Sequence, residues 1–265
     1  MSEIIRFVRY LYNGEEHWGI SKALYIQEIS GDPCNGYRAT DIQHSYAEQS
    51  EKHDEHLEFL PPCQPGQMII VGWNYKDHTP GAAGKGPEIP LFYPLSPRSI
   101  IGHGHKVIYP VGLSRVEHEA ELVVIIGKRA KNVKAADANE YILGYSCGND
   151  VSARDIQNHP EYANLPRAKT VDTFSPIGPF LVTGIDDPSG LAIEARVNGE
   201  VRQSAKISDM FFSVPELIES ITQYMTLEPW DVIFTGTPQG PSAVHPGDTM
   251  VVQIEKVGAL INQVV

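Results

Sequence analysis

Two carboxylates stand two residues apart at Glu119 and Glu121, beside the apolar run at residues 122–126. Side chains alternate along a β-strand, so both carboxylates would point to the same face. Two close anions in a buried setting repel each other and lose hydration, and a hard divalent cation removes both costs. Oxygen ligands suit Mg²⁺ or Mn²⁺, and Asp150 offers a third carboxylate. Taken alone, the pair would favour an exposed edge strand with two hydrated glutamates.

The bulk composition bounds the class of protein. Its 265 residues suffice for one large domain, or for one domain with a small appendage. A net charge of −12 argues against nucleic-acid binding, which needs clustered Lys and Arg. No apolar run approaches the ~20 residues of a membrane span, and residues 1–10 lack a signal-peptide pattern. Three widely spaced cysteines favour a reducing compartment, so we expect a cytoplasmic protein without a membrane partner.

The N-terminal part of the chain has a pattern of its own. Two strand-like segments, 7–12 and 15–20, flank Asn13-Gly14 and predict a β-hairpin. A short helix is expected at about residues 48–59. A Pro-rich linker follows at 61–66.

The remaining chain is typical of a larger domain, so we divide the sequence into residues 1–64 and 65–265. Strand-like segments outnumber helical ones, which favours an α+β, strand-dominated fold built on mixed or antiparallel sheets. One short helix is expected at 135–145, and a longer amphipathic one begins at the capping box Ser213-Val214-Pro215-Glu216. The expected strands are 68–72, 122–126, the pair 191–197 and 200–203 around a second Asn-Gly turn, 231–235 and 249–255.

Several motifs occur in an order that is typical of one family. They are Val71-Gly72-Trp73-Asn74-Tyr75-Lys76-Asp77-His78, residues 94–102, His118-Glu119-Ala120-Glu121-Leu122, residues 144–155, residues 169–179, Val197-Asn198-Gly199-Glu200 and Thr235-Gly236-Thr237-Pro238-Gln239-Gly240. Together they resemble the fumarylacetoacetate hydrolase superfamily, from about residue 66 to the C-terminus. Within it, the chain is similar to the branch of 2-hydroxyhepta-2,4-diene-1,7-dioate isomerases, 5-carboxymethyl-2-hydroxymuconate isomerases and acylpyruvate hydrolases.

The resemblance implies a mixed β-sandwich roll for the larger domain, a homodimer, and one Mg²⁺ or Mn²⁺ held by Glu119, Glu121 and Asp150. It also implies a small-molecule oxo-acid substrate, whose carboxylate and 2-oxygen chelate the cation. Activities in the family include C–C hydrolysis of 2,4-dioxo acids, decarboxylation of oxaloacetate-like acids and isomerisation of 2-hydroxydienoates. Three protein carboxylates leave about three of six octahedral positions for substrate and water.

Further site residues follow from the same resemblance. Lys169 matches a lysine that faces the substrate. His78 matches the catalytic histidine, and a side chain that titrates near neutral pH suits proton transfer. Thr237, together with Gly236, matches the turn that holds the substrate carboxylate.

The far end of the substrate is assigned less directly. Arg154 and Gln157 match positions that reach it in some members, and the planar fork of Arg suits a carboxylate. An ion pair of Arg154 with Asp155 or Asp172 is an equally good interpretation. Three aromatic residues are expected to line the far pocket: Trp73, Tyr93 and Phe174.

One position departs from the family pattern. Hydrolases and decarboxylases commonly carry a glutamate three residues after the histidine, but Gly81 stands there, and Pro80 disfavours the short helix that this loop forms on closure. A histidine without this carboxylate is a weaker base. Three explanations are open. Glu88, in the candidate lid at 79–90, replaces the missing glutamate; Asp77 or a glutamate from elsewhere replaces it; or the reaction needs no water nucleophile.

The leading hypothesis is therefore a metal-dependent enzyme acting on 2-oxo or 2-hydroxydienoic mono- or dicarboxylic acids. Isomerisation or decarboxylation is favoured because neither needs an activated water. A C–C hydrolase of acylpyruvate or fumarylpyruvate type is the alternative, and a non-catalytic metal- or metabolite-binding relative is the alternative of another class. A second departure, Trp230 where relatives usually have glycine, predicts a local packing change near the substrate turn.

Overall fold

The N-terminal hairpin forms as the sequence predicts. In the structure, a computed structural model that describes residues 3–45, 57–79 and 85–265, β1 (Ile5–Tyr12) and β2 (Glu15–Ser21) pair antiparallel around Asn13-Gly14. Both turn residues have positive φ, 52° and 83°, which is the conformation that a tight two-residue hairpin turn requires and that Asn and Gly tolerate.

Three further strands extend this hairpin. They are β3 (Tyr25–Asp32), β4 (Gly36–Ser45) and β5 (Leu57–Phe59). The predicted helix at 48–59 falls mostly outside the described residues, but its end is wrong, because Leu57–Phe59 pairs with β1 as a strand. Phe59 is buried opposite Tyr10, so strand pairing there outweighs local helix preference.

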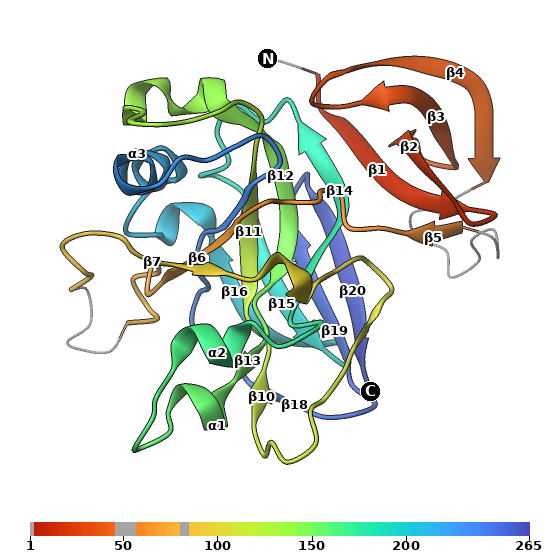
Figure 1. Cartoon of the computed structure of the whole chain (residues 1–265). Helices are drawn as coiled ribbons and strands as arrows, with labels where there is room; N and C mark the ends of the chain where they lie inside the picture. Colours follow the sequence, from red (N-terminus) through yellow and green to blue (C-terminus); the bar gives the residue numbers. More distant parts are fainter. Residues whose placement is uncertain (1–2, 46–56, 80–84) are drawn as a thin grey trace.

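The central sheet continues directly from the hairpin (Figure 1). After β1 come β14 (Ser175–Thr183), β12 (Ile142–Asn149), β11 (Ala120–Ile126), β17 (Val232–Phe234), β6 (Met68–Gly72) and β7 (Leu91–Leu95), with β8 (Ile100–Ile101) joined to β14. The hairpin and the larger part of the chain therefore share one sheet. The division at residues 64 and 65 stays a prediction.

Two smaller sheets complete the strand-dominated α+β fold, which confirms the predicted class. One contains β16 (Glu200–Lys206), β15 (Ala192–Val197), β19 (Thr249–Ile254), β20 (Gly258–Val264) and β9 (Lys106–Val107). The other contains β13 (Ser152–Ala153), β10 (Val116–Glu117) and β18 (Ala243–Val244). The second Asn-Gly hairpin, between β15 and β16, is confirmed.

Helices are short and lie at the edges of the sheets in Figure 1. They are α1 (Arg154–Gln157), α2 (Leu165–Lys169), α3 (Val214–Tyr224) and the 3₁₀ turns Pro97–Ser99, Ala135–Tyr141 and Ile207–Asp209. The capping box at Ser213 and Glu216 is present. The helix predicted at 135–145 is wrong beyond Tyr141, because β12 begins at Ile142 and is held between β11 and β14.

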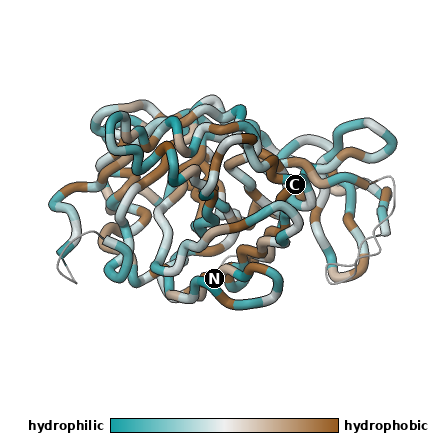
Figure 2. Tube along the Cα trace, turned by 90° about the horizontal axis from the view of Figure 1, so that it is seen from below, coloured by the Kyte–Doolittle hydropathy of each residue, from teal (hydrophilic) through white to brown (hydrophobic). Residues whose placement is uncertain are grey.

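Strand β11 is buried on both faces, which explains its continuous apolar sequence. Leu122, Val124 and Ile126 join one hydrophobic cluster, whereas Val123 and Ile125 join another. Apolar segments accordingly run through the middle of the molecule in Figure 2. Among the described residues, no helix has the length and apolar character that crossing a membrane would require. The core thus fixes the strand that carries Glu121 and directly follows Glu119.

Candidate active site

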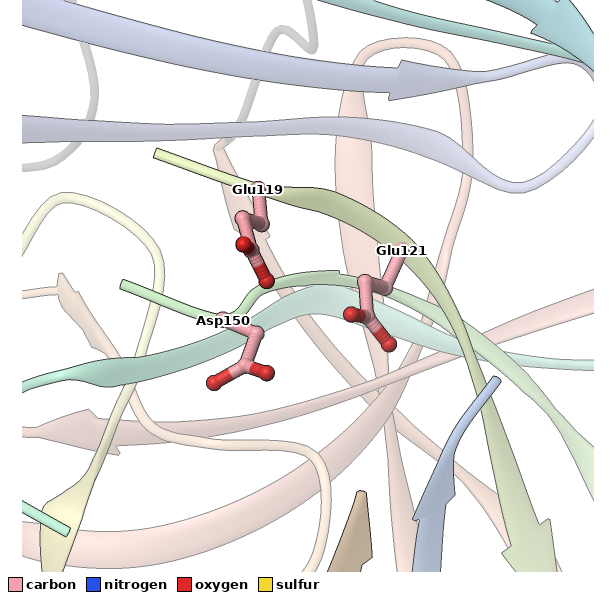
Figure 3. Close-up of side chains that lie close together, drawn as sticks. All are labelled: Glu119, Glu121 and Asp150. Atoms are coloured by element: carbon pink, nitrogen blue, oxygen red, sulfur yellow. The ribbon is translucent and has the colours of Figure 1, made fainter. Parts of the chain in front are cut away.

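The register of β11 and β12 brings the three predicted carboxylates together. Ala120 lies opposite Asn149, and the Asp150 amide donates a hydrogen bond to the Glu119 carbonyl at 2.9 Å. One carboxylate oxygen from each of Glu119, Glu121 and Asp150 lies within 4.8 Å of the others. All three residues are buried, and their carboxyl groups gather on one side of the two strands (Figure 3).

A buried lysine neutralises part of this acidic trio. Lys169 ends α2, and its Nζ donates hydrogen bonds to Glu119 Oε2 at 2.7 Å, Asp150 Oδ2 at 2.5 Å and Ser152 Oγ at 2.8 Å. Burial lowers the pKa of Lys169, but the charges of Asp150, Glu119 and Glu121 outweigh it and raise the pKa above its usual range. The lysine therefore carries a positive charge inside the site.

Ionising all three carboxylates of the trio nevertheless remains unfavourable. Burial would raise the pKa of Glu119, but Lys169 and Arg154 lower it to about 2. Burial raises the pKa of Asp150 to about 6, although the charge of Lys169 opposes this. Burial, together with the charges of Asp150 and Glu119, raises the pKa of Glu121 well above its ordinary value. Asp150 Oδ1 is buried without a hydrogen-bond partner. A divalent cation would relieve each of these costs, so the oxygen donors fit such an ion.

Arg154, at the start of α1, forms its ion pairs within the described residues with Glu117 and Glu119, not with Asp155 or Asp172. Its Nε donates to Glu117 Oε2 at 2.7 Å, and its two Nη atoms donate to Glu119 and to Gln157. Asp155 instead accepts hydrogen bonds from Ser114 and Arg115. Neither sequence interpretation of Arg154 had included Glu117.

The turn after β17 closes the site from the other side. Gly236 has φ +100° and donates its amide to Glu121 Oε2 at 2.7 Å. A Cβ at this position would lie 2.8 Å from that of Asn74, so only glycine fits. The Thr237 hydroxyl donates to the Ala120 carbonyl at 2.9 Å. Both residues thus lie at the acidic trio, as expected of a substrate turn.

A pocket of about 300 Å³ opens onto the trio. His78, Arg154, Gln157, Lys169 and Thr237 all line it, so the structure brings most of the predicted site residues together. A second pocket of about 410 Å³ lies at its mouth and is lined by Asp77, Arg115, Glu117 and Gln239 among others. Burial is the main reason that the pKa of His78 is lowered, and the Arg154 and Lys169 charges add to this.

Residues expected at the far end behave differently from one another. Trp73, at φ +53° and 47% exposed, and Tyr93 line the inner pocket. Phe174 does not; this prediction is wrong, because the ring is fully buried in a separate hydrophobic cluster. Glu88 is exposed and lines neither pocket. Asp77 lines the mouth, where its Oδ1 accepts a hydrogen bond from the Gln239 amide at 3.2 Å.

Two residues of the site were missed from the sequence. Gln203 is buried and joins two segments, since it accepts from the Ala120 amide and donates to Thr237 Oγ1 and the Pro238 carbonyl. Glu117 holds Arg154 and Arg115. The alternation that pairs Glu119 with Glu121 extends back to Glu117, so the signal for this residue was present.

Trp230 makes a long-range contact. It has φ +77°, a conformation that glycine adopts without strain, and its ring stacks on Trp18 of β2 with centroids 5.6 Å apart. The expected packing change therefore involves the N-terminal strands.

Comparison with known proteins defines the family. Residues 67–265 match the model for the fumarylacetoacetate (FAA) hydrolase C-terminal domain, and residues 5–49 match the Rv2993c-like N-terminal model. The chain belongs to the fumarylacetoacetate hydrolase family. An uncharacterized protein of Archaeoglobus fulgidus is 43% identical over 209 residues, which cover 79% of this chain and 82% of that protein.

Named relatives of this family member are enzymes. It is 41% identical over 207 residues to the 4-hydroxyphenylacetate degradation bifunctional isomerase/decarboxylase of Salmonella dublin, covering 77% of this chain and 48% of that protein. The structure of 2-hydroxyhepta-2,4-diene-1,7-dioate isomerase from Mycobacterium marinum superimposes with a TM-score of 0.86 at 33% identity, covering 98% of each chain. The chain is thus a fumarylacetoacetate hydrolase family enzyme, related to isomerases and decarboxylases.

Proposed function

We propose that this enzyme uses one Mg²⁺ or Mn²⁺, held by Glu119, Glu121 and Asp150, to act on 2-oxo or 2-hydroxydienoic carboxylic acids. The observation that carries the proposal is the buried trio of carboxylates, with oxygens within 4.8 Å of one another and one of them, Asp150 Oδ1, without a partner. Hard oxygen donors of this kind select Mg²⁺ or Mn²⁺ over softer metals.

The bound cation would polarise the 2-oxo group and stabilise negative charge that develops on it. The side chains supply the rest. Lys169 Nζ lies between Glu119 and Asp150 and places a second positive charge beside the reacting oxygen. The substrate carboxylate would lie beside Thr237, which lines the pocket, while the Gly236 amide holds Glu121 in place. His78, held neutral by burial, moves the proton at carbon 3.

Isomerisation or decarboxylation is the reaction that these residues support best. The position three residues after His78 holds Gly81, which lies outside the described residues, and Glu88 is exposed away from both pockets. No glutamate among the described residues is therefore paired with the imidazole to activate water. Proton transfer or loss of carbon dioxide needs no such group.

Hydrolysis of a C–C bond remains the second candidate. Asp77 lines the mouth beside His78, and its charge raises the pKa of that histidine against the larger effect of burial. This carboxylate is placed to assist the imidazole in activating a water molecule. Placing a glutamate at Gly81 should then raise hydrolytic turnover only if Asp77 does not already serve.

We also propose a homodimer in the cytoplasm, on the pattern of the family and three free cysteines, Cys34, Cys63 and Cys147. Light scattering coupled to size-exclusion chromatography tests the dimer.

Proton NMR of the protein with Mg²⁺ tests the proposed function and separates its two candidates. The panel is oxaloacetate, acetylpyruvate, fumarylpyruvate and a 2-hydroxydienoate. Carbon dioxide release, or deuterium exchange at carbon 3 without cleavage, is the expected result. Cleavage to pyruvate and a second acid would identify a hydrolase instead. No change in any compound, with or without Mg²⁺, would contradict the proposal.

A further inference from the structure

Glu117 holds two arginines at the mouth of the pocket. Its Oε1 accepts from Arg115 Nη2 at 2.6 Å and Nε at 2.7 Å, and its Oε2 accepts from Arg154 Nε at 2.7 Å. Strand pairing sets this up, because Glu117 lies opposite Ser152 in β13, two residues before Arg154. Glu117 is 4% exposed and the Arg154 side chain 11%, so their pair is shielded from solvent, whereas the Arg115 side chain at the mouth is 62% exposed.

The basic side chains of the described pocket walls are therefore already paired. Lys169 contacts Glu119 and Asp150, Arg154 contacts Glu117 and Glu119, and Arg115 contacts Glu117. Drawing Arg154 toward a second substrate carboxylate would break its buried ion pairs with Glu117 and Glu119. The site consequently offers a substrate one anionic position, at the acidic trio, and no second one.

Much of the remaining wall of the inner pocket is apolar, beside the polar His78, Gln157 and Asn158. Ile70 and Val71 come from β6, Leu91 and Tyr93 from β7, and Leu165 from α2. Ile70 is paired with Tyr93 across the two strands, and Leu91 lies two residues before Tyr93, so these three side chains share one face. Such a surface favours methylene and methyl groups, and it disfavours a charged group that has no partner there.

We propose that Glu117, by holding Arg154 together with Glu119 and by pairing with Arg115 at the mouth, restricts this site to 2-oxo acids with a single carboxylate and an apolar tail. The inference rests on the proposed function and narrows it, because the tail lies on the surface formed by β6, β7 and α2. The proposed substrate has one carboxylate, whereas the dioate in the name of the Mycobacterium marinum isomerase has two.

Calorimetric binding to the Mg²⁺-loaded protein tests the proposal with two matched probes. 2-Oxohexanoate and 2-oxoadipate have the same carbon count and differ only in a terminal methyl or carboxylate. Wild type should bind 2-oxohexanoate at least about tenfold more tightly. Affinity should also rise about fourfold for each methylene from 2-oxobutanoate to 2-oxohexanoate. This series needs no variant, so it stands even if a variant fails to fold.

Glu117→Gln should release Arg115, leave Arg154 held by Glu119 and Gln157, and shift the ratio of the two affinities about tenfold toward 2-oxoadipate. Glu194→Gln is the matched control. It removes the carboxylate that pairs with Arg196, and both residues lie outside the two pockets, so the ratio of the two affinities should stay unchanged.

Equal or tighter binding of 2-oxoadipate by wild type, or an unchanged ratio in Glu117→Gln, would overturn the inference while leaving the proposed function intact. Absence of Mg²⁺-dependent binding of every 2-oxo acid would overturn both.

Discussion

The inner end and the mouth of the pocket are built in different ways. The inner end consists of Glu119, Glu121, Asp150 and Lys169, which are buried and held by paired strands and direct ion pairs. The mouth contains Trp73, Asp77 and His78 on the segment after β6, where exposure is higher and side-chain contacts are fewer. Binding of the cation should therefore depend on the rigid end, and proton transfer and substrate choice on the mouth.

The largest effect is expected at the inner end. Asp150→Ala should weaken Mg²⁺ binding more than about 100-fold and abolish turnover, because a direct ligand counts for more than an outer partner. Calorimetry measures the affinity. Mg²⁺ at about 100 times its Kd should stabilise wild type by about 2.7 kcal/mol and leave the variant unchanged in thermal unfolding. Full activity in Asp150→Ala would refute the metal site.

A substitution at the mouth should separate chemistry from metal binding. His78→Asn should lower kcat by about 10²- to 10⁴-fold, the usual contribution of a general base. Its Mg²⁺ affinity should equal that of wild type, because His78 belongs to the other end of the pocket. Parallel kinetics and calorimetry check this, and a variant that loses both properties would show that the two ends are not independent.

The pH profile of the wild-type enzyme should report the same histidine. Burial lowers the pKa of His78 below its ordinary value of 6.5. A base works in its deprotonated form, so kcat/KM should stay level as the pH falls through 6.5 and decline only below it. A decline centred at or above pH 6.5 would remove His78 from this role.

Stability should depend on the inner end as well. Gln203→Met removes the acceptor of the Ala120 amide and two donated hydrogen bonds, and leaving buried groups unpaired costs about 1–3 kcal/mol. Urea unfolding measures the loss. Gln253→Met, at an exposed position on β19, is the control and should change stability by less than about 0.5 kcal/mol.

The smallest effect is expected for Trp73→Ala. The side chain is 47% exposed, and its loss should change the free energy of unfolding by about 0.5 kcal/mol or less. Tyr75→Ala, only two residues away but fully buried, should cost about 3–5 kcal/mol. Similar losses in the two variants would mean that the mouth is as tightly packed as the core.

Local features of the fold could be predicted from the sequence, whereas long-range contacts could not. Alternation along a strand placed Glu119 and Glu121 on one face, and Asn-Gly turns predicted both hairpins, because these features are local. The strand at 142–149 was missed, since its conformation depends on β14, some thirty residues further along the chain. The hydrogen bonds of Gln203 to residues 120, 237 and 238 were invisible for the same reason. Composition and spacing carry no information on contacts of this range.

The pairing of β1 with β14 also bears on how the protein is made. Ile5 lies opposite Thr183, so β1 meets this partner only after the chain has been translated as far as residue 183. At 5–20 residues per second, the wait is roughly 10–35 s. During that interval β2 and β5 cover part of β1, while the backbone that will bond to residues 181–183 has no strand beside it. Long-range closure of this kind is slow, and an open strand edge is prone to pair with other chains. Chaperone dependence during synthesis should therefore centre on residues 5–7.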